Sequence, residues 1–185
     1  MMQEARMLIE TKRLLLREWQ KSDLEPMTVI NQDPKVMEFF PSTRTYAETE
    51  KFINANISAY EKYGYCLYPV ELKAAGELIG FVGLNYTDWQ AHFTPAVEIG
   101  WRLGAQFWGQ GYATEAAMAV RDFAFNTLNL DELVSFTVPA NVRSRKLMEC
   151  LGFTYDPKDD FDHPMIDVGH AMKRHVLYRL RKDQL

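Results

Sequence analysis

The sequence contains only two cysteines, Cys66 and Cys150, among its 185 residues. Two thiols so far apart provide neither a disulfide framework nor a set of thiolate ligands for a metal ion. No apolar run approaches the ~20 residues that a transmembrane helix needs. Charged residues interrupt Met1–Gln20, which therefore lacks the apolar core of a signal peptide. We expect a soluble protein that has no membrane partner and works in the reducing cytoplasm.

Basic residues are not in excess. The chain has 21 Lys and Arg against 25 Asp and Glu, which gives a formal net charge of −4. A broad nucleic-acid interface needs clustered positive charge, so direct nucleic-acid binding is not expected, although a small phosphate site is compatible with this balance. Repeats, low-complexity stretches and linkers are also absent, and the length suits one domain, which we assign to residues 1–185.

The order of the predicted elements indicates a mixed α/β domain around one central sheet. Helices are expected after Ser22 or Asp23, over about Thr45–Tyr63, from Ala113, and over Asn141–Leu151. Strands are expected at Leu14–Arg17, Cys66–Leu72, Leu78–Asn85, Val97–Leu103, Leu133–Val138, Phe153–Tyr155 and near His175–Arg181. An acidic loop, Asp156–Asp162, separates the last two strands.

The most informative segment is Gln106–Glu115, where a strand leads through Gly109 and Gly111 into a long helix. Glycines allow close approach of the backbone, and the free N–H groups and dipole of a helix start attract anions. The segment lacks the Gly-Lys-Ser/Thr end of a P-loop, and Thr114 stands where a dinucleotide fingerprint has its third glycine. Spacing alone leaves two interpretations open: a pyrophosphate site, or a helix start whose glycines serve tight packing.

The pattern Gln106-x-x-Gly109-x-Gly111, followed by Ala113, resembles the acetyl-CoA motif of the GNAT superfamily of acetyltransferases. Further segments resemble the Rim-type branch, which acetylates the N-termini of ribosomal proteins: Glu10–Arg17, Phe107–Ala116, and Asn141-x-x-Ser144 with Leu151-Gly152-Phe153. The resemblance covers nearly the whole chain. It implies a single-domain GNAT fold in which helices flank a mixed central sheet, splayed between its fourth and fifth strands, Val97–Leu103 and Leu133–Val138.

The resemblance also implies the chemistry. Acetyl-CoA would be the co-substrate, and the acetyl group would pass directly to a primary amine, for example a protein N-terminal α-amino group, in a ternary complex. No metal is implied, and His163, His170 and His175 lack the spacing of a zinc pair. Acetyl-CoA binding is expected at Ile99, Trp101, Leu103, Gln106, Gly109, Gln110, Gly111, Tyr112, Ala113, Thr114, Asn141 and Ser144.

Glu98 is the candidate general base. It lies between apolar Val97 and Ile99 on a predicted strand, and a carboxylate among buried neighbours has a raised pKa. The pattern by itself favours the alternative, in which strand alternation turns Glu98 toward solvent. Because acidic residues on this strand are the common base of the resembled family, the resemblance favours a catalytic role.

Ser144 is the second catalytic candidate. In the resembled branch this serine is placed to protonate or hydrogen-bond the departing thiolate, while Asn141 contacts the pantetheine arm and also suits a helix N-cap. Many GNAT enzymes carry a tyrosine acid seven positions after this asparagine. Met148 occupies that position here, which excludes a tyrosine acid at this place. Cys150 is predicted to be a buried structural thiol and not a covalent acetyl carrier.

The acceptor side is less defined. We predict that Phe39, Phe40 and Tyr86 line it together with Glu98, and that the aspartates of Asp156–Asp162 attract a cationic amine, although aromatic clusters are usually core and acidic loops are usually solvated. Two other functions stay open: a small-molecule amine acetyltransferase, and a sensor of the same fold that binds acyl-CoA without turnover. The protein is expected to be a monomer or a homodimer.

Overall fold

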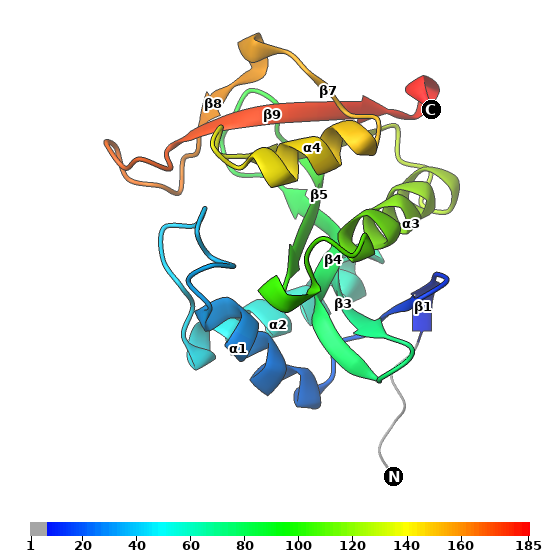
Figure 1. Ribbon diagram of the computed structural model, residues 1–185. Coiled ribbons are helices and arrows are strands. Elements are labelled where there is room, and N and C mark those ends of the chain that lie inside the picture. Colours follow the sequence, from blue (N-terminus) through cyan, green and yellow to red (C-terminus); the bar gives the residue numbers. More distant parts are fainter. Residues whose placement is uncertain (1–6) are drawn as a thin grey trace.

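The computed structural model describes residues 7–185, which form one open sheet flanked by helices (Figure 1). Residues 1–6, which we assign to the same domain from the sequence, lie outside the described residues. The strand order is β1-β2-β3-β4-β5-β6-β9-β7, and β8 pairs with β9. The strands are β1 (Met7–Glu10), β2 (Leu14–Arg17), β3 (Leu67–Leu72), β4 (Glu77–Thr87), β5 (Ala96–Leu103), β6 (Glu132–Thr137), β7 (Thr154–Tyr155), β8 (Phe161–Asp162) and β9 (Arg174–Arg181).

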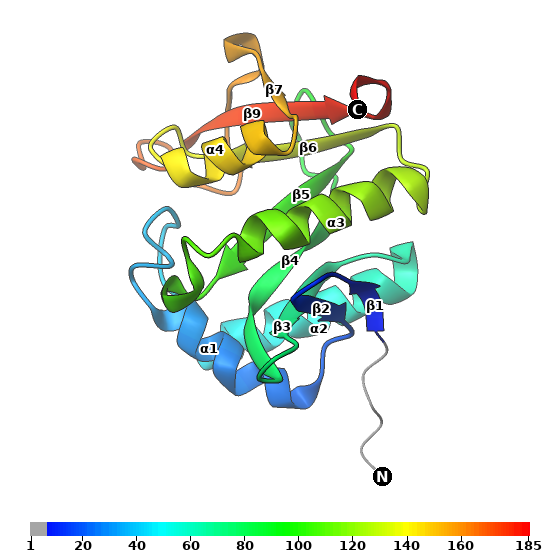
Figure 2. The same ribbon diagram turned by 45° about the vertical axis from the view of Figure 1, so that its right-hand side comes forward.

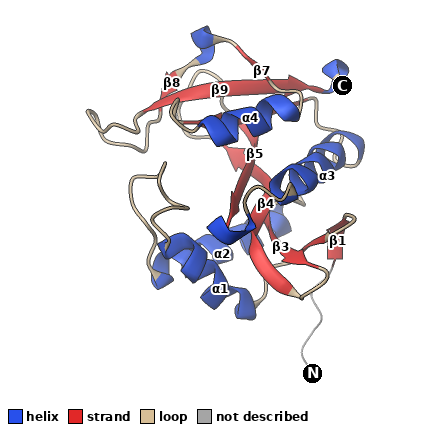
Figure 3. Ribbon diagram, viewed as in Figure 1, coloured by secondary structure: helices blue, strands red, loops and turns tan. Residues whose placement is uncertain are grey.

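Four α-helices cover the sheet: α1 (Leu24–Gln32), α2 (Tyr46–Tyr63), α3 (Tyr112–Asn126) and α4 (Val142–Cys150). Helices α1 and α2 pack together on one side of β4 and β5, and α3 lies on the other side (Figure 1). In the turned view α3 and α4 lie on the same side of the sheet (Figure 2). Apart from the added strands β1 and β8, strands and helices follow one another along the chain in the expected order (Figure 3), which confirms the mixed α/β prediction.

The bounds of α2 follow from its capping residues. Thr45 is the N-cap, and its Oγ1 accepts the Glu48 N–H at 3.2 Å, while Glu48 Oε2 accepts the Thr45 N–H at 2.7 Å. This reciprocal pair satisfies two backbone donors that a helix start otherwise leaves free. Gly64 ends the helix with a left-handed φ of 78°. The predicted helix over Thr45–Tyr63 is therefore confirmed.

Helix α3 approaches the sheet closely because its inner face carries small side chains. Ala116, Ala117, Val120 and Ala124 are all fully buried, and they recur at the spacing of one helix face. Short side chains let the helix axis lie close to the strands below it. The start of α3 is thereby held beside the end of β5.

Strands β5 and β6 separate almost as soon as they meet. They run parallel and pair at one register position, Glu98 with Val134. On their outer sides the same strands pair fully: β5 is antiparallel to β4 from Ala96 to Leu103, and β6 is antiparallel to β9 over its whole length. The predicted splay between these strands is confirmed.

Three expectations need correction. Strand β1 was not predicted, because its four residues at the sheet edge carry no alternating pattern. The predicted acidic loop contains strand β8, whose Phe161 pairs with His175 of β9. The predicted burial of Cys150 is wrong: its thiol is exposed, whereas Cys66 is buried. Helix α4 buries Met148 and leads into buried Leu151, and the two residues between them, Glu149 and Cys150, face outward.

A buried ion-pair network joins the start of the sheet to α1. Arg17 Nη1 and Nη2 donate to the two carboxylate oxygens of Asp23, both at 2.8 Å, and Arg17 Nε donates to Glu71 at 2.8 Å. The Arg17 and Asp23 side chains are 10% and 3% exposed. Asp23, predicted as a helix cap, thus has its carboxylate engaged by Arg17 and by the Gln20 N–H.

Replacement of Asp23 by alanine should destabilise the fold strongly. The Arg17 charge would stay buried with one carboxylate partner fewer, and breaking a buried pair in this way costs about 3 kcal/mol or more. Urea unfolding should therefore show a midpoint well below that of the wild type. The matched control is Asp162→Ala, which breaks the exposed pair with Arg174; the expected loss there is below about 1 kcal/mol. Equal losses in the two variants would contradict the role assigned to burial.

Candidate active site

The loop before α3 presents a run of free backbone donors. Gly109 and Gly111 adopt left-handed φ values of 75° and 80°, and Gly111 is the N-cap of α3. Among the described residues, no hydrogen-bond acceptor is recorded for any backbone N–H from residue 109 to 114, and the first bond of the helix runs from the Glu115 N–H to Gly111 O. Such amides, together with the helix dipole, suit a pyrophosphate. The geometry of the loop therefore fits the first of the two interpretations, a pyrophosphate site.

Glu115 fastens this loop to the start of the chain. Its Oε1 accepts the Thr11 hydroxyl at 2.6 Å and the Arg13 N–H at 2.8 Å, and its Oε2 accepts Arg13 Nε at 2.6 Å. Arg13 Nη1 also donates to Gln110 O at 3.0 Å, and its guanidinium lies over the Tyr112 ring. Partial burial opposes ionisation, but these hydrogen bonds and the Arg13 charge outweigh it and hold the pKa of Glu115 below its usual value. The segments Glu10–Arg17 and Phe107–Ala116, which lie far apart in the sequence, are therefore in contact here.

The backbone of β5 faces two different neighbours in turn. The Gly104 N–H donates to Ile79 O of β4, whereas Ile99 O, on the other edge, accepts the Ser135 hydroxyl of β6 at 2.9 Å. Backbone groups of alternate residues point the same way along a strand. The peptide groups of Ile99, Trp101 and Leu103 therefore face the gap toward β6, and those of the residues between them face β4. This is the edge that the resemblance assigns to the pantetheine arm.

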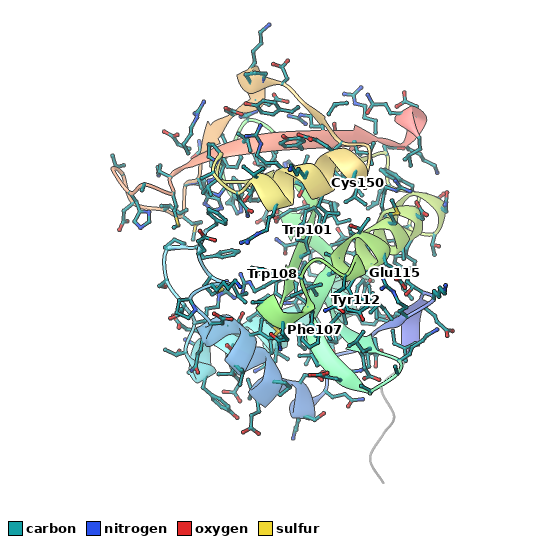
Figure 4. The ribbon with its side chains drawn as sticks, in the orientation of Figure 1. Trp101, Phe107, Trp108, Tyr112, Glu115 and Cys150 are labelled. Atoms are coloured by element: carbon teal, nitrogen blue, oxygen red, sulfur yellow. The ribbon has the colours of Figure 1, made fainter. Side chains whose placement is uncertain are left out.

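Trp108, for which the sequence predicts no role, connects the end of β5 to α4. Its Nε1 donates to Leu103 O at 2.9 Å. The Arg143 guanidinium of α4 lies over its ring, 4.1 Å from the centroid, and also donates to Glu38 at 3.2 Å. Figure 4 shows Trp101 and Trp108 between α4 and the start of α3, with Cys150 at the far end of α4. The covalent route through Cys150 gains no support from this position.

The N-terminus of α4 borders the same gap. Asn141 is its N-cap: Oδ1 accepts the Ser144 N–H at 3.2 Å, and Nδ2 donates to Thr137 Oγ1 at 3.0 Å. The Ser144 side chain is half-buried, and no hydrogen bond of its hydroxyl is recorded within residues 7–185. Ser144 Oγ thus retains its donor for a ligand. Met148, in the position of the absent tyrosine acid, is fully buried.

Glu98 lies at the point where β5 and β6 separate. Burial raises the pKa of its carboxyl group to about 7, against an opposing effect of the Asn85 amide, which donates to Oε2 at 3.4 Å. The side chain nevertheless keeps partial contact with solvent. Gly100, the next residue on the same face, lies beside the carboxylate: a Cβ there would be in ordinary van der Waals contact with Leu67 at 3.6 Å and with Glu98 Oε1 at 3.8 Å.

The predicted acceptor residues do not form one pocket. Phe40 lies over Arg102 near the end of β5, whereas Tyr86 pairs with Val97 near its beginning and stacks on Tyr63. Tyr86 also points to the side of β4 opposite to Asn85, whose amide reaches Glu98. Phe39 is half-buried on the connection between α1 and α2. The roles of all three residues in acceptor binding stay predictions.

The aspartates of the acidic segment are engaged within the chain. Asp159 pairs with Arg179 at 2.7 Å and with His92 at 3.4 Å, and Asp162 pairs with Arg174. Asp156 caps a short turn by accepting the Lys158 N–H, and Asp160 accepts the Tyr155 hydroxyl. Two of the four aspartates, Asp159 and Asp162, are thus paired with cations of β9, while Asp156 and Asp160 accept hydrogen bonds from neutral groups. The attraction of a cationic amine by this segment stays a prediction.

Comparison with known families decides the identity of this arrangement. A family model described as an acetyltransferase (GNAT) domain matches residues 13–154, well over half of the chain. The chain belongs to the GNAT acetyltransferases. The GNAT domain accounts for the splayed sheet, the glycine loop and the order of the elements between them.

Individual relatives agree with this assignment. YnaD, an uncharacterized N-acetyltransferase of Bacillus subtilis (strain 168), is 31% identical over 179 residues, 96% of this chain and 99% of that protein. The solved structure of an acetyltransferase from Agrobacterium tumefaciens C58 is 29% identical, with a TM-score of 0.75 and coverage of 95% of this chain and 94% of that chain. RimL, a ribosomal L7/L12 α-N-protein acetyltransferase in complex with coenzyme A, has a TM-score of 0.77 at 18% identity and covers 97% of this chain and 100% of its own, which shows the shared fold.

The family match and the relatives that are named as acetyltransferases show that this GNAT chain is an acyltransferase. Within residues 7–185, no helix is both long and apolar enough to cross a membrane. The same residues contain no group of three His, Cys, Asp or Glu side chains placed to hold a metal ion.

Replacement of Glu115 by glutamine should destabilise the GNAT domain in a pH-dependent way. Loss of the charge weakens three hydrogen bonds, and we expect a loss of about 2 kcal/mol at pH 7. A carboxylate whose folded-state pKa is lowered stabilises the fold above its unfolded pKa of ~4.3, and this stabilisation disappears as the pH falls through the folded-state value. The stability difference between wild type and variant, measured by urea unfolding, should therefore shrink below pH 4.

The control for this prediction is Asp122→Asn on the same helix, where the carboxylate is exposed and paired only with its neighbour Arg121. Its effect should stay within about 0.5 kcal/mol. A Glu115→Gln deficit that is undiminished at pH 3 would mean that the ionised carboxylate is not what fastens the loop.

Proposed function

We propose that this protein is an acetyl-CoA-dependent N-acetyltransferase that transfers the acetyl group directly to a primary amine, such as a protein N-terminal α-amino group, in a ternary complex. The observation that carries the proposal is the position of Glu98. A half-buried carboxylate with a pKa of about 7 stands at the single point where β5 and β6 pair, at the mouth of the gap between them. Amine acetylation needs a base of this kind there.

The residues around the gap fit the co-substrate. The free amides of residues 109–114 suit the pyrophosphate, and the backbone edge of Ile99, Trp101 and Leu103 suits the amide-bearing pantetheine arm. Gln106 supplies its carbonyl to Gln110 Nε2 at 3.0 Å, which shapes the loop. Acetyl-CoA, when bound, would supply an activated thioester. RimL, with the same fold, is known in complex with coenzyme A.

Each chemical task then has a candidate group in the chain. Glu98 accepts a proton from the acceptor ammonium, directly or through water, because its carboxylate is ionised near pH 7 and keeps contact with solvent. Ser144 Oγ has a free donor for the departing thiolate. A serine hydroxyl is a weak acid, so its contribution is hydrogen bonding more than proton delivery.

Two alternatives have the same fold. A small-molecule amine acetyltransferase would use the same base and cofactor loop with a different acceptor. A sensor would bind acyl-CoA without turnover. Release of CoA thiol with a panel of peptides, amino acids, polyamines and aminoglycosides separates the three, because turnover excludes the sensor and acceptor preference separates the enzymes.

Glu98→Gln should lower kcat by about 10²- to 10³-fold, as expected for loss of a general base, while the Kd for acetyl-CoA stays unchanged. In the wild type, kcat should rise with pH through an apparent pKa near 7, because the ionised form is the active one. The variant should lose this step, and its residual rate should rise only as solvent deprotonates the amine. Initial rates from pH 5.5 to 9.5 and calorimetric titration with acetyl-CoA provide the measurements.

The control is Glu77→Gln, since Glu77 is exposed at the start of β4, at the end of that strand remote from Asn85. Its pH profile should match that of the wild type. A Glu98→Gln variant that retained both full turnover and the step near pH 7 would refute Glu98 as the base.

Ser144→Ala should lower kcat by about tenfold with little change in the KM for acetyl-CoA, because one hydrogen bond to developing charge is worth about 1–2 kcal/mol. Ser144→Thr, which retains a hydroxyl, serves as the matched control and should recover part of the rate. A normal kcat in the alanine variant would remove Ser144 from the mechanism.

A further inference from the structure

Arg102 is a buried cation on the same face of β5 as Glu98. Its side chain points toward α1 and α2, where its guanidinium lies over the Phe40 ring at 4.2 Å and near the Phe81 ring at 5.2 Å. The residue is 6% exposed. Its Nη1 donates to Asn31 Oδ1 of α1 at 2.7 Å, and Asn31 in turn donates to Thr49 Oγ1 of α2. One edge of the guanidinium is thus fixed by the protein.

The other edge of the guanidinium is free. Arg102 Nε is fully buried and has no hydrogen-bond partner among the described residues, and no bond is recorded for Nη2 within the same residues. No carboxylate of residues 7–185 forms an ion pair with Arg102 either. Nε and Nη2 form the fork that binds a carboxylate through two parallel hydrogen bonds. A buried guanidinium whose Nε and Nη2 donors have no recorded partner can therefore supply the hydrogen-bond donors of an anion site.

A second arginine lies beside the first. Arg44, half-buried on the connection between α1 and α2, lies over the Phe52 ring at 5.3 Å. Burial, together with the neighbouring Arg44 charge, lowers the pKa of Arg102 to about 9. The carboxylate that acts on Arg44 is that of Glu48, whose Oε2 is already engaged by the N–H and hydroxyl of Thr45. Within residues 7–185, neither arginine forms an ion pair with a carboxylate, and Glu48 acts on Arg44 only through its charge.

We propose that Arg102 and Arg44 form an anion subsite for the acceptor, which binds a carboxylate carried at some distance from the reacting amine. Phe40, which is 38% exposed, covers one face of the Arg102 guanidinium. The subsite rests on the proposed function, because it shares the β5 face with the base Glu98. It narrows the substrate class to amines with a remote negative charge.

The spacing along β5 sets the length of that acceptor. Glu98 and Arg102 are four residues apart on one strand, which places their Cα atoms ~13 Å from each other. An α-amino acid, with its amine and carboxylate on one carbon, is too short to reach both. An extended peptide advances ~3.3 Å per residue, so an acidic side chain at its third or fourth residue spans the distance. A flexible ω-amino acid of similar length has the same two groups.

The test compares acceptors that differ only in this charge. Tetrapeptide amides with serine first and glutamate at position two, three or four are assayed beside their glutamine counterparts, and long ω-amino acids beside their amides. We expect kcat/KM to favour glutamate at position three or four by about tenfold or more, through bidentate pairing with arginine. A preference seen with the ω-amino acids instead identifies a small-molecule acceptor, and one seen with the peptides a protein N-terminus; both support the subsite.

Variants localise the effect. Arg102→Gln and Arg44→Gln should each remove the difference in kcat/KM between charged and neutral acceptors, whereas Arg174→Gln, at an exposed ion pair, is the matched control and should keep it. Arg44 is only half-buried, so its variant keeps the test valid if Arg102→Gln fails to fold. Wild-type enzyme that turns over charged and neutral acceptors equally would overturn the subsite and leave the proposed function intact.

Binding separates the two proposals further. Titration of the protein with N-acetylated glutamate and glutamine peptides in the presence of CoA measures the subsite without turnover. Tighter binding of the glutamate peptide, lost in Arg44→Gln, would support the subsite even if no amine were acetylated. Equal binding of both peptides would contradict it whatever the rate.

Discussion

Parallel strands β5 and β6 pair at Glu98 and Val134 and then diverge, and this separation determines most of what the fold can bind. Antiparallel partners on the outer sides, β4 and β9, hold the two strands in place, so the gap persists without the hydrogen bonds that would close it. The peptide edge of Ile99, Trp101 and Leu103 thereby faces the gap. The Ser135 hydroxyl and the Trp108 indole occupy the carbonyls of Ile99 and Leu103, so the groups of Trp101 at the centre of the edge are left for a ligand. Because Glu98 lies where the two strands diverge, its side chain is partly buried and yet keeps contact with solvent.

A second set of contacts aligns the cofactor loop with that gap. The small inner face of α3 lets the helix pack closely on the sheet, and Glu115 ties its first turn to Thr11 and Arg13, 104 and 102 residues earlier in the chain. The opening motif of the sequence and the glycine loop are thus parts of one structural unit. Trp108 and Arg143 complete it from the side of α4.

Features set by local chemistry could be predicted from the sequence. Thr45, Glu48 and Gly64 determine α2 through short-range bonds, and Gly109 with Gly111 predicted a loop of free amides before α3. Contacts between distant segments could not be predicted. Asp159 and Asp162 looked free because their partners, Arg179 and Arg174, lie on another strand. The unpaired Nε of Arg102 likewise depends on the contacts that β5 makes with α1 and α2, which the sequence does not reveal. Cys150 shows the same limit, since the spacing of its neighbours did not reveal which side of α4 faces outward.

The free amides at the start of α3 have one more consequence. A ligand held by main-chain N–H groups is recognised by atoms that every residue except proline carries, so only the left-handed positions Gly109 and Gly111 constrain the residue type there. The proposed acceptor, in contrast, would be recognised by the side chains of Glu98 and Arg102 on the opposite face of β5. In this proposal one half of the reaction is encoded in backbone shape and the other in side-chain identity, so mutation could change the acceptor while the use of the acyl donor is inherited unchanged.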